Sequence, residues 1–218
     1  ILSAGMEEPN ALFTLGEGAR SEPNVAATLT DLVDGLVARS QNAWPSPDFD
    51  LMAVNSALAP LFQSGFYYKT FMGPTKGAWM FYEPFIRKAA GLGRATALPD
   101  PDRYDTRHGF CDVLVVGSGP AGLAAALAAA RCGARVVLAE QDLELGGSLL
   151  SETDAASAAW LQACVAELES FDEAQLLTRT TVQGLYDGNL AVLLERRDHR
   201  RPDPRKGEAR QVLTSLRF

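Results

Sequence analysis

The sequence predicts an α/β fold with a parallel β-sheet, preceded by a mostly helical segment. Two short β-branched runs flank an alanine-rich stretch within residues 111–140, and a glycine-rich turn joins the first run to that stretch. Apolar residues recur at helical spacing in several stretches before residue 95. Short apolar runs without alternation are typical of strands that are buried on both faces of a parallel sheet.

The first part of the chain is expected to contain loops and helices. Glycines and prolines punctuate residues 1–24, which predicts a loop. Apolar residues at helical spacing predict one helix over residues 27–40 and another over residues 75–90. A further helix is expected to begin at Asp48 or Asp50, because a carboxylate can cap the first turn.

Three features interrupt or follow these helices. Pro84 lies inside the helix expected over residues 75–90 and should kink it or split it into two pieces. Residues 65–71 are aromatic and are expected to be extended. Residues 94–109 are rich in Asp and Arg, and we expect them to form a polar linker.

The second part of the chain contains one complete βαβ unit in about 30 residues, as a parallel sheet requires. A turn is expected at Asp187-Gly188, between two later strands. The expected elements are, in order, strand 111–116, helix 120–132, strand 135–140, helix 155–171, strand 175–182, strand 190–195, a charged loop over 196–210 and the start of a strand over 211–218.

Composition excludes several classes of function. The net charge of −7 makes the surface as a whole a poor binder of nucleic acid or of anionic membranes. The three cysteines lack CxxC spacing, which disfavours a zinc site and a disulfide framework and fits a reducing, cytoplasmic compartment. The longest apolar run, residues 123–130, is too short to span a bilayer.

Catalytic chemistry is not visible in these residues. No Ser/His/Asp triad, acid–base pair of carboxylates or metal-ligand cluster is recognisable, so we predict no catalytic residue and no metal site. The chain begins at Ile1 and the expected sheet looks incomplete, so we expect a fragment of a longer protein.

The sharpest signal is the motif Gly117-Ser118-Gly119-Pro120-Ala121-Gly122, which lies between an expected strand and an expected helix. Gly117 permits the tight turn, Gly119 lets a pyrophosphate approach the backbone, and Gly122 lets the helix pack closely on the strand. The N–H groups at the helix start face the phosphates, and Pro120 is tolerated there because a first-turn N–H has no helical partner. The motif predicts a Rossmann-like dinucleotide site.

A carboxylate stands where the ribose of a dinucleotide would lie. Glu140 ends the second strand, 23 residues after Gly117, and could accept two hydrogen bonds from a ribose diol. It would repel a 2′-phosphate, and Gln141 and Asp142 supply no compensating arginine, so NAD or the ADP half of FAD is favoured over NADP. Gly146-Gly147 is either a simple turn or a second approach of the backbone to the dinucleotide.

Longer stretches resemble a known family. The run Asp112–Gly122, then Ala139–Asp142 and Gly146-Gly147, resembles flavoproteins with two dinucleotide-binding domains. Upstream, residues 3–12 are similar to the tail of a ferredoxin-like domain. The stretches Asp34-Gly35-Leu36, Ser40-Gln41-Asn42 and Gly65–Phe71 look like the long α subunits of heterotetrameric sarcosine oxidases, and this resemblance covers essentially the whole chain.

The resemblance implies an organisation for the whole chain. Residues 1–24 would be the tail of an upstream ferredoxin-like domain, residues 25–110 a helical lead-in and linker, and residues 111–218 the first part of the dinucleotide-binding domain. A folate-binding domain would follow beyond this chain.

The resemblance also implies an activity. Enzymes of this family oxidise sarcosine to glycine at FAD on the β subunit, pass the one-carbon unit to tetrahydrofolate, and pass electrons through FMN at the α/β interface to oxygen, giving H2O2. The partners would be the β, γ and δ subunits. The α-subunit dinucleotide site would hold NAD that takes no part in turnover.

Carried onto this sequence, the resemblance implies a set of NAD contacts. Val182 would touch the adenine through its backbone. The other implied contacts are Gly117, Gly119, Ala121, Gly122, Glu140, Gln141, Asp142, Gly147 and Ser148, and the motif adds Pro120 and Gly146 as candidates.

Two other functions stay open. The first is an FAD-binding domain of an amine, opine or imino-acid dehydrogenase, with which the doublet Gly146-Gly147 is compatible. The second is a non-enzymatic assembly module whose nucleotide fold only organises subunits.

Overall fold

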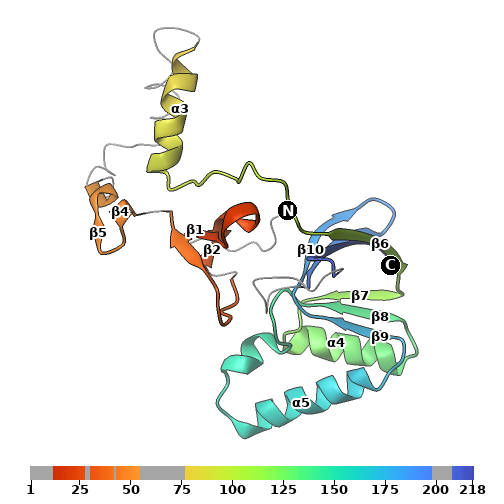
Figure 1. The fold of residues 1–218 in the computed structure, drawn as a ribbon. Coiled ribbons are helices and arrows are strands. Elements are labelled where there is room, and N and C mark those ends of the chain that lie inside the picture. Colours follow the sequence, from red (N-terminus) through yellow and green to blue (C-terminus); the bar gives the residue numbers. More distant parts are fainter. Residues whose placement is uncertain (1–11, 28–29, 42, 55–76, 198–207) are drawn as a thin grey trace. The chain divides into compact units, whose positions relative to one another are not determined.

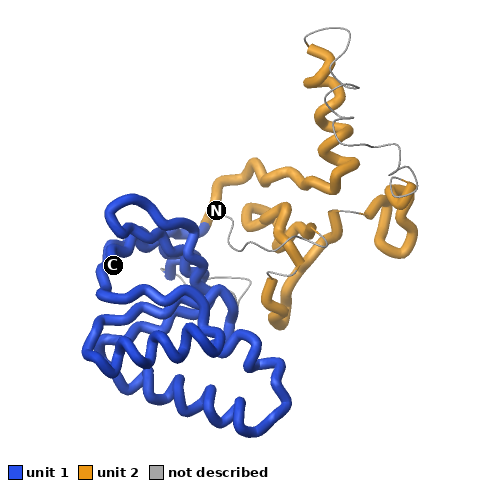
Figure 2. Tube along the Cα trace, turned by 180° about the vertical axis from the view of Figure 1, so that it is seen from behind, with its two compact units in different colours: residues 1–6, 102–218 blue, residues 7–101 orange. Residues whose placement is uncertain are grey.

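A computed structural model describes residues 12–27, 30–41, 43–54, 77–197 and 208–218. The chain divides into two compact units (Figure 2). Residues 7–101 (unit 2 in the figure, orange) are called the first unit in chain order, and residues 102–218 with residues 1–6 (unit 1 in the figure, blue) are called the second unit. Each unit has sheets of its own. Within the described ranges, none of the helices is both long and apolar enough to cross a membrane.

The second unit combines a parallel sheet, two helices and a mainly antiparallel sheet. The parallel sheet has the order β7-β8-β9, and the other sheet has the order β10-β11-β12-β6. The elements are β6 Tyr104–Phe110, β7 Val113–Val116, α4 Pro120–Arg131, β8 Val136–Ala139, the 3₁₀ helix η5 Gly147–Ser151, α5 Ala155–Glu169, β9 Ala174–Leu177, β10 Thr180–Tyr186, β11 Leu190–Arg196 and β12 Gln211–Arg217.

These elements form three layers, with the parallel sheet in the middle (Figure 1). Along β8, Val136 and Leu138 belong to the core cluster formed with α4 and α5, whereas Val137 and Ala139 belong to the cluster formed with β11 and β12. Side chains alternate between the two faces of a strand, so β8 is buried on both sides. Its purely apolar sequence follows from that position.

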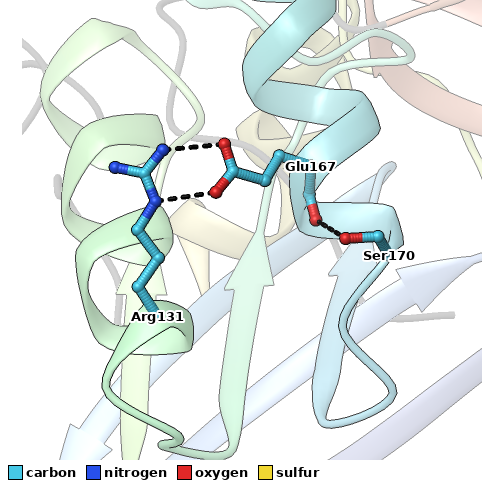
Figure 3. A network of polar contacts seen from close by, with 3 residues as sticks. All are labelled: Arg131, Glu167 and Ser170. Carbon is cyan, nitrogen blue, oxygen red and sulfur yellow. Dashed lines mark hydrogen bonds and ion pairs between the residues drawn. The ribbon is translucent and has the colours of Figure 1, made fainter.

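An ion pair joins the two helices that cover the sheet. Arg131, at the end of α4, donates from Nε and Nη2 to the two carboxylate oxygens of Glu167 on α5, each at 2.7 Å (Figure 3). Ser170 donates its hydroxyl to the Glu167 carbonyl oxygen at 2.6 Å and so helps to end α5. Arg131 is largely exposed, so the pair contributes to alignment more than to stability.

Most elements predicted for this unit are confirmed within a few residues. The strand–helix–strand unit, the helix over 155–171, the strand over 190–195 and the final strand all form. The turn at Asp187-Gly188 also forms, with Gly188 at φ +75°.

The single strand predicted over residues 175–182 is wrong. The chain instead leaves the parallel sheet after β9 and enters the other sheet as β10. Arg179 lies at the corner with φ +51°, and its N–H donates to the Asp142 carbonyl oxygen at 2.8 Å. This left-handed residue turns the chain from one sheet to the other.

The polar linker predicted over residues 94–109 is wrong in its second half. Residues 104–110 form β6, which pairs in parallel with β12, from Tyr104 opposite Gln211 to Phe110 opposite Arg217. The strand lies at the edge of its sheet and most of its side chains are exposed, which explains its polar sequence.

Among its described residues, the first unit contains a three-stranded antiparallel sheet with the order β2-β1-β3, a hairpin of two strands of two residues each, and the α-helix α3. A 3₁₀ helix at Gly18–Arg20 joins β1 to β2. The elements are β1 Leu12–Leu15, β2 Glu22–Ala26, β3 Ala38–Ser40, β4 Pro45–Ser46, β5 Phe49–Asp50, the 3₁₀ helix Leu51–Ala53 and α3 Ala78–Ala89.

The side-chain amide of Gln41 connects parts of this unit. Its oxygen accepts from Thr14 Oγ1 at 3.0 Å and from the Asn24 N–H at 2.8 Å. Its nitrogen donates to Asn24 Oδ1 at 2.9 Å and to the Gly91 carbonyl oxygen at 3.0 Å. One amide thus connects β1, β2 and the segment that follows α3.

Two predictions for this unit are wrong. Residues 12–15 and 22–26 are strands where a loop was predicted, and the helix predicted over residues 27–40 does not form. Leu32, on the apolar stripe of that predicted helix, is 92% exposed, and Gly35 adopts φ +80° in a turn. Apolar spacing alone therefore gave a false helix, and the turn at Gly35 interrupts the predicted span.

Two other predictions for this unit are confirmed, a helix and a helix cap. Helix α3 confirms the helix predicted over residues 75–90, and Pro84 lies inside it without dividing it. Asp50 caps the start of a helix, as predicted, with its carboxylate accepting from the Met52 N–H at 2.8 Å. The rest of that helix and the extended stretch predicted over residues 65–71 lie outside the described residues.

Candidate dinucleotide-binding site

The glycine-rich loop connects β7 to α4 at the carboxyl end of the parallel sheet. Gly117 adopts φ +90°, a conformation that L side chains rarely adopt, and its N–H donates to the Ala139 carbonyl oxygen at 2.8 Å. A Cβ on Gly122 would lie 2.0 Å from the Gly117 carbonyl oxygen. Both glycines therefore have the roles predicted for them, a tight turn and a close approach of the helix to the loop.

The space in front of α4 is open. Gly119 is the N-cap residue, and a Cβ placed on it would meet no atom within 4 Å. No side chain among the described residues caps this helix, and Pro120 occupies its first turn. The N–H groups of Ala121 and Gly122 thus begin a helix whose positive dipole end is available to an anion. A pyrophosphate fits this cradle, which a side chain at residue 119 would fill.

Glu140 follows β8 directly, and its side chain turns towards the glycine loop. It is only 6% exposed. Its Oε2 accepts from the N–H and the hydroxyl of Ser118, at 2.7 and 2.6 Å, and its Oε1 accepts from the Asp142 N–H at 3.0 Å. Burial raises the pKa of Glu140, but these hydrogen bonds lower it by more, so the pKa lies below its ordinary value and the group is ionised at neutral pH.

Ser118 is the residue of this site that sequence reasoning missed. It is fully buried, and its hydroxyl lies between Glu140 Oε2 and the Gly146 N–H, which donates to Ser118 Oγ at 3.0 Å. A signal was available in the sequence. The carboxyl ends of neighbouring parallel strands meet at one edge of a sheet, so a polar residue at the second motif position faces a carboxylate that ends the next strand.

The doublet Gly146-Gly147 lies against the glycine loop. A Cβ on Gly147 would lie 3.0 Å from the Gly119 Cα, and both doublet glycines have positive φ angles, +135° and +54°. Ser148 is the next residue of η5. The doublet is therefore more than a remote turn, because it packs directly beside the cradle.

The segment after Glu140 is fixed from the β9–β10 corner. The Thr180 N–H donates to the Glu140 carbonyl oxygen at 2.7 Å. Val182 lies two residues further along β10, and its side chain packs on the core cluster that contains Ala139. Arg196, at the end of β11, donates from Nη2 to the Gln141 carbonyl oxygen at 2.9 Å, a contact that sequence reasoning also missed.

The arrangement can bind an anionic, ribose-bearing ligand. It offers backbone N–H groups at a helix start and one ionised carboxylate a short distance along the sheet edge. In the part of the chain that is described, no group of three or more His, Cys, Asp or Glu side chains could hold a metal ion.

Comparisons with known proteins agree with this geometry. Residues 112–210 match the family described as FAD dependent oxidoreductase. The chain is 52% identical over 200 residues, 90% of its length, to sarcosine oxidase subunit alpha of Rhizobium meliloti (strain 1021). It is 35% identical over 205 residues to sarcosine oxidase subunit alpha of Corynebacterium sp. (strain U-96).

The chain spans only 20% and 16% of the lengths of these two relatives. Among solved structures, L-proline dehydrogenase from P. horikoshii is 17% identical, with a TM-score of 0.39 over 57% of this chain and 24% of its own. The resemblance to sarcosine oxidase α subunits is confirmed, since the chain is similar over nine-tenths of its length to a segment of them. The α/β fold of the FAD/NAD(P)-binding type is confirmed as well.

Proposed function

We propose that this chain is a segment of a sarcosine oxidase α subunit and that its glycine loop holds NAD as a non-catalytic cofactor. The open cradle at Gly119, beside an uncapped helix start, is the observation that carries the binding of a dinucleotide. The 52% identity to a sarcosine oxidase α subunit supports the assignment to that subunit, and the choice of NAD follows from the resemblance to its family. The ionised Glu140 disfavours a 2′-phosphate, and so NADP.

In this proposal different residues bind the pyrophosphate, the ribose and the base of the ADP part of the dinucleotide. The glycine loop and the start of α4 would bind the pyrophosphate, and Glu140 the adenosine ribose. Val182 would lie along the adenine. The full set of proposed contacts is Gly117, Gly119, Pro120, Ala121, Gly122, Glu140, Gln141, Asp142, Gly146, Gly147, Ser148 and Val182. The bound NAD supplies no redox step, so these residues bind and orient.

The activity belongs to the complete enzyme. We propose that it oxidises sarcosine to glycine with FAD and FMN held on or with a β subunit, transfers the one-carbon unit to tetrahydrofolate, and reduces oxygen to H2O2. Further γ and δ subunits would complete a cytoplasmic complex. The free state of all three cysteines supports a reducing compartment. Within it, residues 1–24, 25–110 and 111–218 would be the ferredoxin-like tail, the lead-in and the start of the dinucleotide-binding domain.

A redox FAD in the same site is the second candidate. The match of residues 112–210 to FAD-dependent oxidoreductases favours it, and FAD carries the same adenosine ribose and pyrophosphate. The protein would then be a dehydrogenase of amines, opines or imino acids.

The small molecules released from the full-length α subunit distinguish these candidates. The subunit is purified from cells and denatured, and the supernatant is analysed by mass spectrometry. Release of NAD without flavin is the expected result. Release of FAD would replace the proposal by the second candidate. A subunit that holds neither molecule, yet assembles with its partners, would be an assembly module.

A further inference from the structure

The segment that follows β8 is held by residues that come much later in the chain. Residues 140–142 have three consecutive carbonyl oxygens, and each of them accepts a hydrogen bond. The Thr180 N–H donates to the first at 2.7 Å, and the Arg179 N–H donates to the third at 2.8 Å. The second, that of Gln141, accepts from Arg196 Nη2 at 2.9 Å. Of these three donors, only that of Arg196 belongs to a side chain.

The contacts of Arg196 close a ring. Its backbone N–H donates to the Arg179 carbonyl oxygen at 3.0 Å. The Arg179 N–H donates to the Asp142 carbonyl oxygen, and the Arg196 side chain returns to Gln141, the neighbour of Asp142. Because Arg179 has a φ of +51°, the ring joins a left-handed corner to the segment after β8. Each contact restricts the same short stretch of backbone, so the contacts support one another.

The N–H groups of this segment also have partners within the protein. The Glu140 N–H donates to a carbonyl oxygen at the end of β9 at 2.8 Å. The N–H groups of Gln141 and Asp142 both donate to the Glu140 carboxylate. The segment therefore presents its side chains, rather than its backbone, to a ligand. Gln141 is half-buried and Asp142 is exposed, and the place of both side chains depends on the backbone that Arg196 holds.

The next residue on the same strand end makes a different kind of contact. Arg197 is exposed, and its guanidinium donates to the Glu195 carboxylate at 2.9 and 3.1 Å. That pair stays within β11 and its end, whereas Arg196 reaches a carbonyl oxygen 55 residues earlier in the chain. A guanidinium keeps its proton at any ordinary pH, so the donor to Gln141 is always present.

We propose that Arg196 is a positioning residue of the dinucleotide site, which holds the Gln141 carbonyl oxygen and thereby places the Gln141 and Asp142 side chains at the adenosine end. The inference rests on the proposed function, because it needs a dinucleotide in the site, and it applies equally to NAD and FAD. Arg196 itself touches no ligand. It acts only through the segment that it holds.

The test removes the donor and keeps most of the side chain. The full-length α subunit is freed of its ligand, and the affinity for NAD is measured. Arg196→Met should bind NAD about tenfold more weakly, since a hydrogen bond from a charged group is lost. Arg196→Lys keeps a charged donor on a shorter chain and should lose only about threefold. Arg197→Met is the matched control and should stay within about twofold of the wild type.

A double-mutant cycle separates positioning from a general weakening of the fold. With Gln141→Ala and Asp142→Ala together, the side chains that Arg196 places are absent. Adding Arg196→Met to this pair should then weaken NAD binding by less than about twofold. The same loss with and without the two alanines would overturn the inference. Wild-type NAD affinity in a folded Arg196→Met, or an equal loss in Arg197→Met, would overturn it as well.

The outcomes distinguish the inference from the function on which it rests. If the wild-type subunit releases FAD, FAD replaces NAD as the probe for the same variants. A wild-type subunit that takes up neither NAD nor FAD refutes the proposed function and the inference with it. If Arg196→Met fails to fold, Arg196→Lys takes its place in the cycle. Its threefold loss should then disappear in the presence of the two alanines, and no loss at all, or a loss that persists, would contradict the role of Arg196.

Discussion

Adding one methyl group at two neighbouring glycines should separate ligand binding from folding. The changes are Gly119→Ala and Gly122→Ala, three residues apart in the loop between β7 and α4. The chemistry of the two substitutions is the same, but the surroundings differ. A Cβ at Gly119 meets no atom within 4 Å, whereas a Cβ at Gly122 meets the Gly117 carbonyl oxygen at 2.0 Å.

The cost at Gly122 follows from that contact. The methyl group must move about 1 Å to reach a normal separation, and the carbonyl it meets belongs to a residue held at φ +90° by a hydrogen bond to Ala139. Overpacking of this kind costs about 1–3 kcal/mol or more, and the gain in helix propensity from Gly to Ala is about 1 kcal/mol. We expect Gly122→Ala to lose about 2 kcal/mol of free energy of unfolding.

The cost at Gly119 falls on binding instead. Its φ of −64° suits alanine, so the free energy of unfolding should change by less than about 1 kcal/mol. The methyl group would stand where the pyrophosphate approaches the backbone, and we expect the bound dinucleotide to fall at least about tenfold.

Both variants are made in the full-length α subunit, and the dinucleotide content of the purified proteins is measured by mass spectrometry. Thermal melting is then measured after the ligand has been removed from all three proteins, because a bound ligand itself raises the melting temperature. The expected pattern is a normal melting temperature with an empty site for Gly119→Ala, and a lowered melting temperature for Gly122→Ala. A Gly119→Ala protein with full dinucleotide content would refute the cradle. An unchanged melting temperature in Gly122→Ala would refute the packing argument.

Three other side chains give measurable expectations. The hydrogen bonds that lower the pKa of Glu140 stabilise the fold above the ordinary glutamate pKa, about 4.3, and this stabilisation is lost as the pH falls through the lower native pKa. Unfolding, and with it dinucleotide release, should therefore increase at pH values below the ordinary glutamate pKa, and Glu140→Gln should lack this pH-dependent step. Gln41→Ala removes four hydrogen bonds and should lower the free energy of unfolding of the first unit by about 2 kcal/mol. The measurement is the rate of proteolysis of this unit, which should increase. Gln41→Glu is the control, because it keeps the oxygen that accepts from Thr14 and Asn24. Glu167→Gln should lower the melting temperature only slightly, and 1 M salt should remove the difference from wild type, because the exposed Arg131 is its partner.

Local sequence signals predicted the βαβ unit well. Helix α4 was expected over residues 120–132 and spans Pro120–Arg131, because a glycine turn, a proline in the first turn and a terminal Gly133 bound it within a few residues. Strand β6 could not be predicted in this way. Its pairing partner β12 lies about a hundred residues away, and its own sequence is polar because it lies at a sheet edge.

The sequence predicted which residues form the candidate site, but not the hydrogen bonds between them. The spacing from Gly117 to Glu140 indicates which groups lie near a ribose, since adjacent parallel strands end at one edge. It does not reveal that Ser118 occupies the acceptor positions of Glu140, because that depends on a buried side-chain rotamer. The contact from Arg196 to Gln141 depends on the corner at Arg179, which no local pattern indicated.

The position of Glu140 explains why one carboxylate can organise the whole site. It follows β8, the middle strand of the parallel sheet, in which all four residues are buried between the helices and the second sheet. Its carboxylate holds the glycine loop through Ser118, and Ser118 holds the Gly146-Gly147 doublet. The ligand-facing segments are therefore tied together before any dinucleotide enters. Binding would then cost little free energy for ordering these segments, which favours tight retention of the proposed dinucleotide.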